Sequence, residues 1–151
     1  MTNRFQVVPA AYIALQRNKQ VLLQLRANTG YMDGHWAMAA AGHVEADESV
    51  YDAAIREARE EIGVGIEVVD LTPLCAMHRT HGRHQWDDER VDFFFSCTRW
   101  SGEPRLLEPD KAADLGWFQL DELPDPVVPH ELTVLHGLLD GTLRPLVTFG
   151  F

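Results

Sequence analysis

Segment 49–63 constrains the fold most, because it has helix signals at both ends and a helical repeat between them. Ser49 is a favourable N-cap residue, and Asp52 lies where a capping box places its second partner. Gly63 stands where a helix commonly ends in a left-handed glycine. The apolar residues that recur at helical spacing are Tyr51, Ala54, Ile55, Ala58 and Ile62. The chain is therefore expected to bury one face of a central helix.

Strand-like segments flank this helix on both sides. Apolar, β-prone sequence predicts strands over 4–15, 21–25, 36–41, 66–77, 91–97 and 115–120. Pro73 predicts an edge position or a break in the fourth of these segments. A second helix is expected over 131–139, after a proline-rich stretch. This order predicts a single α/β or α+β domain that covers residues 1–151.

The charge balance argues against several classes of partner. Lysine and arginine total 13 and aspartate and glutamate total 23, so the net charge is −10. A chain this acidic is a poor candidate for binding nucleic-acid backbone or an anionic membrane. No apolar stretch approaches the roughly 18 residues of a membrane span, and no signal-peptide core is visible. Cys75 and Cys97 each lie in an apolar run, which indicates reduced core thiols and predicts a cytoplasmic protein.

Three carboxylates form a patch beside the apolar stripe of the central helix. On a helical wheel, Glu57, Glu60 and Glu61 are contiguous. Glu57 and Glu61 are like charges four positions apart, which destabilises a helix mildly, and only Glu60 has a basic residue, Arg56, at helical spacing. One interpretation is a solvated acidic face. The other is a Mg²⁺ site, because this cation prefers oxygen ligands and would make the patch attract a diphosphate.

The spacing of these residues resembles a known motif. The pattern is G-x5-E-x7-R-E-U-x-E-E-x-G-U, where U is apolar, and it is matched by Gly42, Glu48, Arg56, Glu57, Glu60, Glu61 and Gly63, with Ala58 and Val64 at the apolar positions. Seven identities at about 6% background each match by chance in about one window in 10⁸. The pattern resembles the Nudix box, here over 42–64, and looser similarity to MutT-like Nudix hydrolases runs over about 21–139.

The resemblance implies a fold and an activity. It implies the Nudix fold, a mixed β-sheet in an α/β/α sandwich with the box as loop–helix–loop. It also implies hydrolysis of a nucleoside diphosphate linked to a group X, with Mg²⁺ or Mn²⁺ as the cofactor. A MutT-like conversion of a nucleoside triphosphate to monophosphate and pyrophosphate is the first expectation. An ADP-ribose or nucleotide-sugar pyrophosphatase and a non-catalytic nucleotide-sensing module are the alternatives.

Carried over by position, the resemblance implies a set of metal ligands. Glu57, Glu60 and Glu61 are expected to be ligands, and one of them is expected to help activate water. The backbone carbonyl of Ala41, just before the first box glycine, is expected to be another ligand. The chain departs from the family here, because segment 39–42 reads Ala-Ala-Ala-Gly in place of the usual Pro-Gly-Gly or Pro-Ala-Gly.

Two further charged residues have implied roles near the box. Arg56 resembles the arginine that orients the box carboxylates, with Glu48 as its expected partner; a plain pair four positions apart, with Glu60 or Asp52, is compatible with this role. Segment 102–108 resembles the loop that supplies a later acidic ligand in MutT-like members. It puts Glu108 in that role, with Glu103 and Asp110 as rivals and a solvated loop carboxylate as the alternative.

Substrate contacts are expected from two other places. Arg26 follows the second predicted strand, where family members often place a basic residue near the phosphates, although a solvent-exposed arginine fits equally well. His130 and Glu131 begin the last helix, where MutT-like enzymes place base-contacting side chains; simple helix-start residues are the alternative. The expected partner is therefore a small nucleotide, and a homodimer is compatible with the superfamily.

A histidine-rich loop follows the fourth predicted strand. His78, His81 and His84 suggest zinc, but a structural zinc site needs four ligands and no cysteine lies nearby. A loop cation that meets phosphate, with Arg79, Arg83 or a histidine, is the preferred interpretation.

Overall fold

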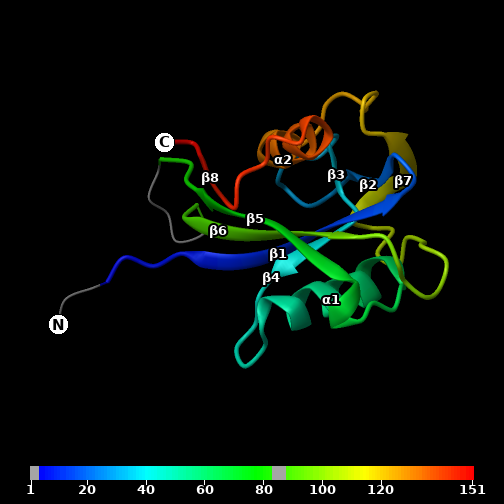
Figure 1. Cartoon of the computed structure of the whole chain (residues 1–151), viewed down its shortest axis with the longest axis horizontal. Coiled ribbons are helices and arrows are strands. Elements are labelled where there is room, and N and C mark those ends of the chain that lie inside the picture. Colours follow the sequence, from blue (N-terminus) through cyan, green and yellow to red (C-terminus); the bar gives the residue numbers. More distant parts are fainter. Residues whose placement is uncertain (1–3, 83–87) are drawn as a thin grey trace.

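The computed structural model describes residues 4–82 and 88–151. Strands and helices alternate along the chain, and Figure 1 shows α1 and α2 on opposite sides of the strands. In order, the elements are β1 (Val8–Arg17), β2 (Gln20–Arg26), β3 (Trp36–Met38), β4 (Ala40–His43), α1 (Val50–Ile62), the 3₁₀ turn η1 (Val68–Asp70), β5 (Leu71–Arg79), β6 (Arg90–Cys97), β7 (Ala112–Gln119), α2 (Pro129–Asp140) and β8 (Leu146–Phe149).

The sheet is mixed. Its strands follow the order β3-β2-β1-β6-β5-β8, with β4 paired to β1 and β7 paired to β2. β1 runs parallel to β6 and β8 runs parallel to β5, whereas the other pairs are antiparallel. A parallel pair needs a crossover connection, and the chain between β1 and β6 supplies one that includes α1.

Alternate residues of β1 face the two helices, because successive side chains of a strand point to opposite faces. Ala11 and Ile13 pack in one core with Ala58 of α1. Tyr12 packs in a second core with Leu135 of α2. The central strand is therefore buried on both faces, and the expected mixed sheet between helices is confirmed (Figure 1).

Several predicted boundaries were wrong. The strand expected over 66–77 begins only after η1 and continues to Arg79, inside the segment predicted as loop. The segment 36–41 divides at Ala39, because β3 pairs with β2 whereas β4 pairs with β1. β8 was not predicted; it is a four-residue edge strand whose alternating residues are at most half-buried. The break predicted at Pro73 is present, since the pairing of β5 with β6 shifts register between Pro73 and Cys75.

The two cysteines are buried and are not disulfide-bonded, as predicted. Cys75 packs in the α2-side core and Cys97 in the α1-side core, so they lie on different faces of the sheet. Burial raises the pKa of the Cys75 thiol to about 11, which keeps it protonated near neutral pH. Neither helix in residues 4–82 and 88–151 is long and apolar enough to span a membrane.

Candidate active site

The central helix α1 begins and ends as its sequence predicts. The Ser49 hydroxyl accepts a hydrogen bond from the Asp52 backbone amide at 3.1 Å, and Asp52 accepts one from the Ser49 amide at 3.0 Å. Gly63 ends the helix with a left-handed φ of 70°. Because both ends are held locally, the glutamates of α1 have a defined direction relative to β4, which is the element that packs beside them.

Arg56 connects the carboxylates of the box. Its guanidinium donates to both oxygens of Glu48, from Nε at 3.0 Å and from Nη2 at 2.7 Å. Nη1 donates to Glu57 at 2.7 Å and to Glu60 at 3.3 Å. The expected pairs with Glu48 and Glu60 are both present, whereas Asp52 is used in the helix cap. The bidentate pair is a strong, directional contact, and it lowers the pKa of Glu48 to about 2.

The contact between Arg56 and Glu57 was not predicted. The helical wheel places the two Cβ atoms about 100° apart, so the two residues are not neighbours at helical spacing. The long arginine side chain covers this angle, and its Nη1 lies 2.7 Å from Glu57 Oε1. Arg56 therefore ties Glu57 to the helix surface as well as to the preceding loop through Glu48.

Glu57 and Glu61 face β4, whereas Glu60 faces solvent. The side chain of Glu57 is 13% exposed and that of Glu60 is 54% exposed. A Cβ atom on Gly42 would overlap the Glu57 carboxylate, which explains why the box needs a glycine there. Glu61 Oε2 accepts a hydrogen bond from the Ala41 amide at 3.1 Å. The three carboxylates of the predicted patch therefore occupy two different environments.

Burial and mutual repulsion affect the two inner glutamates. Burial raises the pKa of Glu57, and it raises the pKa of Glu61 well above its usual range, with the charge of Glu57 as the second cause. Two buried carboxylates that repel each other form an oxygen donor set that a hard divalent cation would stabilise. As the side chains stand in residues 4–82 and 88–151, no three His, Cys, Asp or Glu groups are arranged to hold a metal. Glu57 and Glu60 are paired with Arg56 instead.

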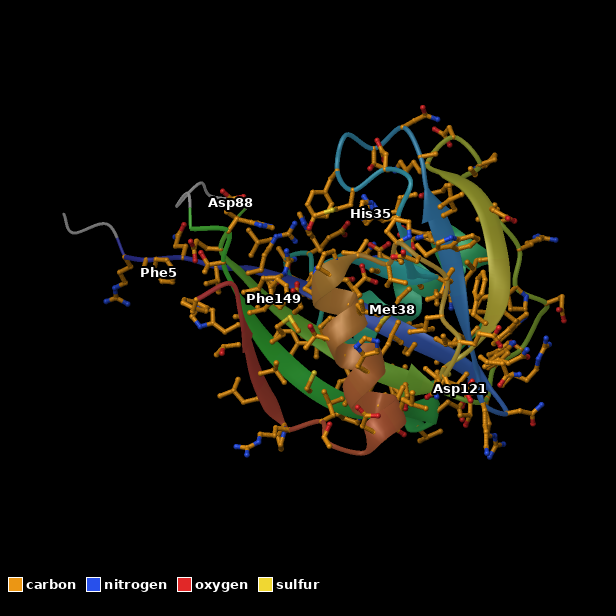
Figure 2. All side chains as sticks on the ribbon, turned by 90° about the horizontal axis from the view of Figure 1, so that it is seen from above. Phe5, His35, Met38, Asp88, Asp121 and Phe149 are labelled. Atoms are coloured by element: carbon orange, nitrogen blue, oxygen red, sulfur yellow. The ribbon has the colours of Figure 1, made fainter. Side chains whose placement is uncertain are left out.

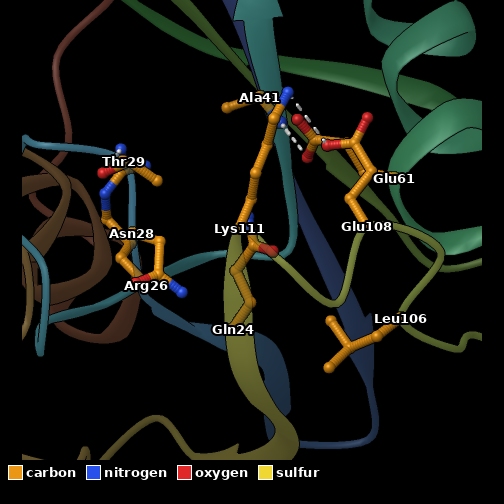
Figure 3. A pocket seen from close by; sticks show the side chains of 9 residues that line it. All are labelled: Gln24, Arg26, Asn28, Thr29, Ala41, Glu61, Leu106, Glu108 and Lys111. Atoms are coloured by element: carbon orange, nitrogen blue, oxygen red, sulfur yellow. Dashed lines mark hydrogen bonds and ion pairs between the residues drawn. The ribbon is translucent and has the colours of Figure 1, made fainter.

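Two cavities meet at Glu61 and Arg26. The larger, of about 410 Å³, is shown in Figure 3 and extends to Glu108 and Lys111. The smaller, of about 180 Å³, extends to His130 and Glu131 at the start of α2. We call them the large and the small cavity. The residues that line both are Gln24, Arg26, Ala41 and Glu61.

Two charged residues of the segment before β7, one acidic and one basic, line the large cavity beside the box. Glu108 lines it together with Glu61, and its Oε2 lies 3.7 Å from Lys111 Nζ. Glu103 and Asp110, the rival residues, are not among the side chains that line it. Figure 3 shows Glu61 and Glu108 on one side of the cavity and Arg26, Asn28 and Thr29 on the other. Lys111 was not predicted, because a lone lysine in a loop has no distinguishing pattern.

The small cavity has a buried polar floor. His130 and Glu131 are each 3% exposed, so they are not ordinary exposed helix-start residues. His130 Nε2 lies 3.2 Å from the Tyr12 hydroxyl, and Glu131 accepts a hydrogen bond from the Met38 amide at 2.7 Å. Burial lowers the pKa of His130 to about 2 and raises that of Glu131 to about 7. The floor therefore presents a neutral imidazole and a carboxyl group that titrates near neutral pH.

Arg79, one of the suggested loop cations, does not lie in a loop, although it lines the small cavity. It ends β5, is 2% exposed, and its Nε donates to Asp92 at 2.7 Å, which keeps the buried charge paired. His78 packs against the Phe151 ring, whereas His81 contacts Arg79 and Tyr31. The other two members of the predicted loop, Arg83 and His84, lie outside the described residues.

Comparisons with known proteins support one family. The model of the NUDIX domain matches residues 6–138. The chain is 31% identical over 143 residues to the NAD-capped RNA hydrolase NudC of Mannheimia succiniciproducens, covering 91% of this chain but 49% of that protein. It is 28% identical over 135 residues to the uncharacterized Nudix hydrolase YfcD of Escherichia coli K12, covering 83% of this chain and 68% of that protein. The chain thus spans about half the length of NudC.

A solved structure supports the same family, and the match covers nearly the whole chain of that structure. The MutT NUDIX hydrolase from Burkholderia pseudomallei superposes with a TM-score of 0.79 at 31% identity, and the match covers 87% of this chain and 98% of that one. The family match over residues 6–138 contains α1, the box and all but the last two residues of α2, so sequence and fold agree. The chain belongs to the NUDIX domain family.

Proposed function

We propose that this chain hydrolyses a diphosphate linkage in a nucleoside diphosphate-X compound, with Mg²⁺ or Mn²⁺ as cofactor. The first substrate class is a nucleoside triphosphate, cleaved to the monophosphate and pyrophosphate. One observation supports this proposal most: Glu61 and Arg26 both line the place where the two cavities meet. A carboxylate that suits a cation and a guanidinium that suits a phosphate are thereby brought to one spot.

The chain offers oxygen ligands for the metal around Glu61. Glu57, Glu60 and Glu61, the Ala41 carbonyl and Glu108 would hold it, since Ala41 and Glu108 line the large cavity with Glu61. When bound, a divalent cation supplies Lewis-acid polarisation of phosphate oxygens and lowers the pKa of a coordinated water. Arg56 orients the carboxylates through its contacts to Glu48, Glu57 and Glu60.

The hydrolysis itself needs a proton acceptor and a positioned phosphate. Water oxygen bonds to one phosphorus, the bridging P–O bond breaks, and the leaving phosphate takes the bonding electrons. A carboxylate of the Glu57–Glu61 pair is proposed to accept the water proton, since both face β4 beside the cavities. Arg26 is proposed to bind phosphate oxygens. His130 and Glu131 are proposed to contact the nucleobase, because they form the polar floor of the small cavity.

A second candidate substrate is a diphosphate with a sugar or nucleoside on both sides. The large cavity, at about 410 Å³, extends from Glu61 to residues that do not line the small one, among them the polar side chains of Asn28, Thr29 and Lys111. The NudC relative acts, by its name, on NAD-capped RNA. The net charge of −10 favours a small molecule over an RNA chain for this protein.

Product identification would test both candidates. Purified protein with Mg²⁺ would be incubated with ribo- and deoxynucleoside triphosphates, ADP-ribose, NAD, nucleotide sugars and dinucleoside polyphosphates. Glu61→Gln is the inactive control, and Glu67→Gln, at an exposed position outside the box, is the matched control. Monophosphate and pyrophosphate from one triphosphate, absent with Glu61→Gln, would support the first candidate. Turnover restricted to conjugates would favour the second, and tight nucleotide binding without turnover would favour a sensing module.

A further inference from the structure

Arg26 is held by a loop that the proposed chemistry leaves without a role. The loop covers residues 27–35 and joins β2 to β3; we call it the Asp33 loop. Arg26 Nε donates to the Tyr31 carbonyl at 2.9 Å, and Nη2 donates to the Thr29 hydroxyl at 3.0 Å. Among the described residues, Nη1 has no hydrogen-bond acceptor, while the Arg26 side chain lines both cavities. Two edges of the guanidinium are therefore fixed, and the third remains for a ligand.

Asp33 holds the acceptors of Arg26 in place. Its Oδ1 lies 2.6 Å from the Thr29 hydroxyl, and its carboxylate accepts the backbone amides of Thr29 at 3.0 Å and Gly30 at 2.9 Å. The Thr29 hydroxyl has a single hydrogen and two acceptors within reach, the Asp33 carboxylate and the Tyr31 carbonyl at 2.9 Å. The charged carboxylate is the stronger acceptor, so the hydroxyl donates to Asp33. The Thr29 oxygen then has its lone pairs directed to the Tyr31 amide at 3.1 Å and to Arg26.

The conformation of the Asp33 loop needs a central acceptor such as the Asp33 carboxylate. Asn28 and Met32 have left-handed φ values of 58° and 51°, a conformation that asparagine tolerates but that is unfavourable for methionine. The loop is also attached to the segment that contains Glu108: the Asn28 side chain donates to the Asp110 carbonyl at 3.1 Å, and the Ala27 amide donates to the Lys111 carbonyl at 3.0 Å. Asp33 thus organises the strained part of a loop that borders the large cavity.

The connection between Asp33 and Arg26 is indirect, and this matters for anion binding. A direct ion pair would neutralise the guanidinium and weaken its attraction for phosphate. Here the Thr29 hydroxyl lies between the two charges, so Arg26 is oriented while its Nη1 edge stays available. We propose that Asp33 is a positioning residue that acts through Thr29 to direct Arg26 toward a phosphate group of the substrate. This inference rests on the proposed function, in which Arg26 binds phosphate.

The sign of the effect distinguishes positioning from simple charge. If Asp33 acted only as a nearby negative charge, Asp33→Asn would remove repulsion and strengthen binding of an anion. If Asp33 positions Arg26, the same substitution weakens binding by about tenfold, the usual effect of losing one charge-assisted hydrogen bond. Thr29→Val should have a similar effect because it removes the intermediate hydroxyl, whereas Thr29→Ser, which keeps the hydroxyl, should restore most of the binding.

The experiment measures KM and kcat for the substrate identified above, together with the Kd of magnesium tripolyphosphate, which has no base. Variants are Asp33→Asn, Thr29→Val, Thr29→Ser, Arg26→Ala and the double variant Asp33→Asn/Arg26→Ala. Asp121→Asn is the matched control, because this exposed aspartate lies at the other end of the β2–β7 pair from Arg26. Figure 2 shows it far from the Asp33 loop, in which His35 is labelled. Thermal unfolding of each variant establishes that it is folded.

The expected result is a higher KM and a weaker tripolyphosphate Kd for Asp33→Asn, with kcat changed less than KM. In the Arg26→Ala background, Asp33→Asn should have no further effect, since the two residues act as one unit. Additive effects, an unchanged Kd or stronger binding by Asp33→Asn would overturn the inference, as would a wild-type protein that does not bind tripolyphosphate. Absence of turnover with every substrate would contradict the proposed function alone, because the tripolyphosphate Kd still reports on Asp33.

Discussion

The carboxylate of Glu57 occupies the space that a side chain at position 42 would fill, so Gly42 and Glu57 are matched across α1 and β4. The backbone of Gly42 has no left-handed φ, and its conformation therefore suits any residue. The requirement for glycine is the close approach of the carboxylate, which Arg56 also holds through Glu57 Oε1. The first glycine of the box is thus explained by the position of a glutamate that follows it by fifteen residues in the sequence.

This relationship predicts the effect of Gly42→Ala. The added methyl group would displace the Glu57 carboxylate, and kcat should fall by about 100-fold, since displacements near 1 Å at a reacting centre have effects of that size. Steady-state kinetics and thermal unfolding would measure it. In Glu57→Ala the carboxylate that would overlap the added methyl group is absent. Adding Gly42→Ala to that variant should therefore lower the unfolding temperature less than Gly42→Ala does in the wild type. A fully active Gly42→Ala protein would contradict the prediction.

The repulsion between Glu57 and Glu61 predicts stabilisation by metal. Burial raises the pKa of both groups, and a divalent cation that binds between them would relieve the cost of ionising them. At about 100-fold above its dissociation constant, Mg²⁺ should raise the unfolding temperature by about 5 °C or more. EDTA should reverse the shift and abolish turnover.

Glu61→Gln provides the control for this metal effect. The amide keeps the size of the side chain and an oxygen that can accept the Ala41 amide, but it lacks the charge. The shift with Mg²⁺ should therefore be much smaller in this variant, while Glu67→Gln should respond like the wild type. Equal shifts in all three proteins would place the cation elsewhere.

The parts of the site that the sequence predicted are those with local causes. The capping box of Ser49 and Asp52, the end of α1 at Gly63 and the pair of Arg56 with Glu48 all depend on residues within one helix and its preceding loop. Spacing along a helix determines such contacts, because the period of 3.6 residues fixes which side chains are neighbours.

The parts that the sequence did not predict depend on pairing between distant segments. Arg79 meets Asp92 only because β5 and β6 are antiparallel neighbours, and Tyr12 meets His130 only because α2 packs on β1. β8 is four residues long and lies at the sheet edge, so it has little hydrophobic pattern to reveal it. Glu108 was named by resemblance, and its place beside Glu61 follows from the course of a long loop.

Arg56→Lys should lower activity although the charge is kept. Lysine has one ammonium group and cannot reproduce the paired contacts to Glu48 at 2.7 and 3.0 Å while also holding Glu57. Less constrained carboxylates should lower kcat by at least about tenfold. Arg59→Lys, on the same helix and exposed, is the matched control and should have nearly wild-type kinetics. Equal activity of the two variants would show that the network around Arg56 has no effect on the reaction.

Glu131 and His130 predict opposite pH dependences of stability. The pKa of Glu131 is raised to about 7, above its unfolded value of 4.5. The stability that its protonated form contributes is therefore complete below pH 4.5 and is lost as pH rises through 7. The pKa of His130 is lowered to about 2 from 6.5, so the unfolded chain gains a proton first and stability falls as pH drops below 6.5. Each effect has a limiting slope of about 1.4 kcal/mol per pH unit.

Chemical denaturation between pH 5 and 8.5 would separate the two groups. Glu131→Gln keeps an acceptor for the Met38 amide but does not titrate, so its unfolding free energy should fall less than that of the wild type between pH 5 and 7. As pH falls from 6.5 to 5, His130→Gln should gain stability relative to the wild type, because the unfolded chain no longer binds that proton. If the difference in unfolding free energy between each variant and the wild type did not change with pH over its interval, the two side chains would titrate normally. The floor of the small cavity would then be open to water.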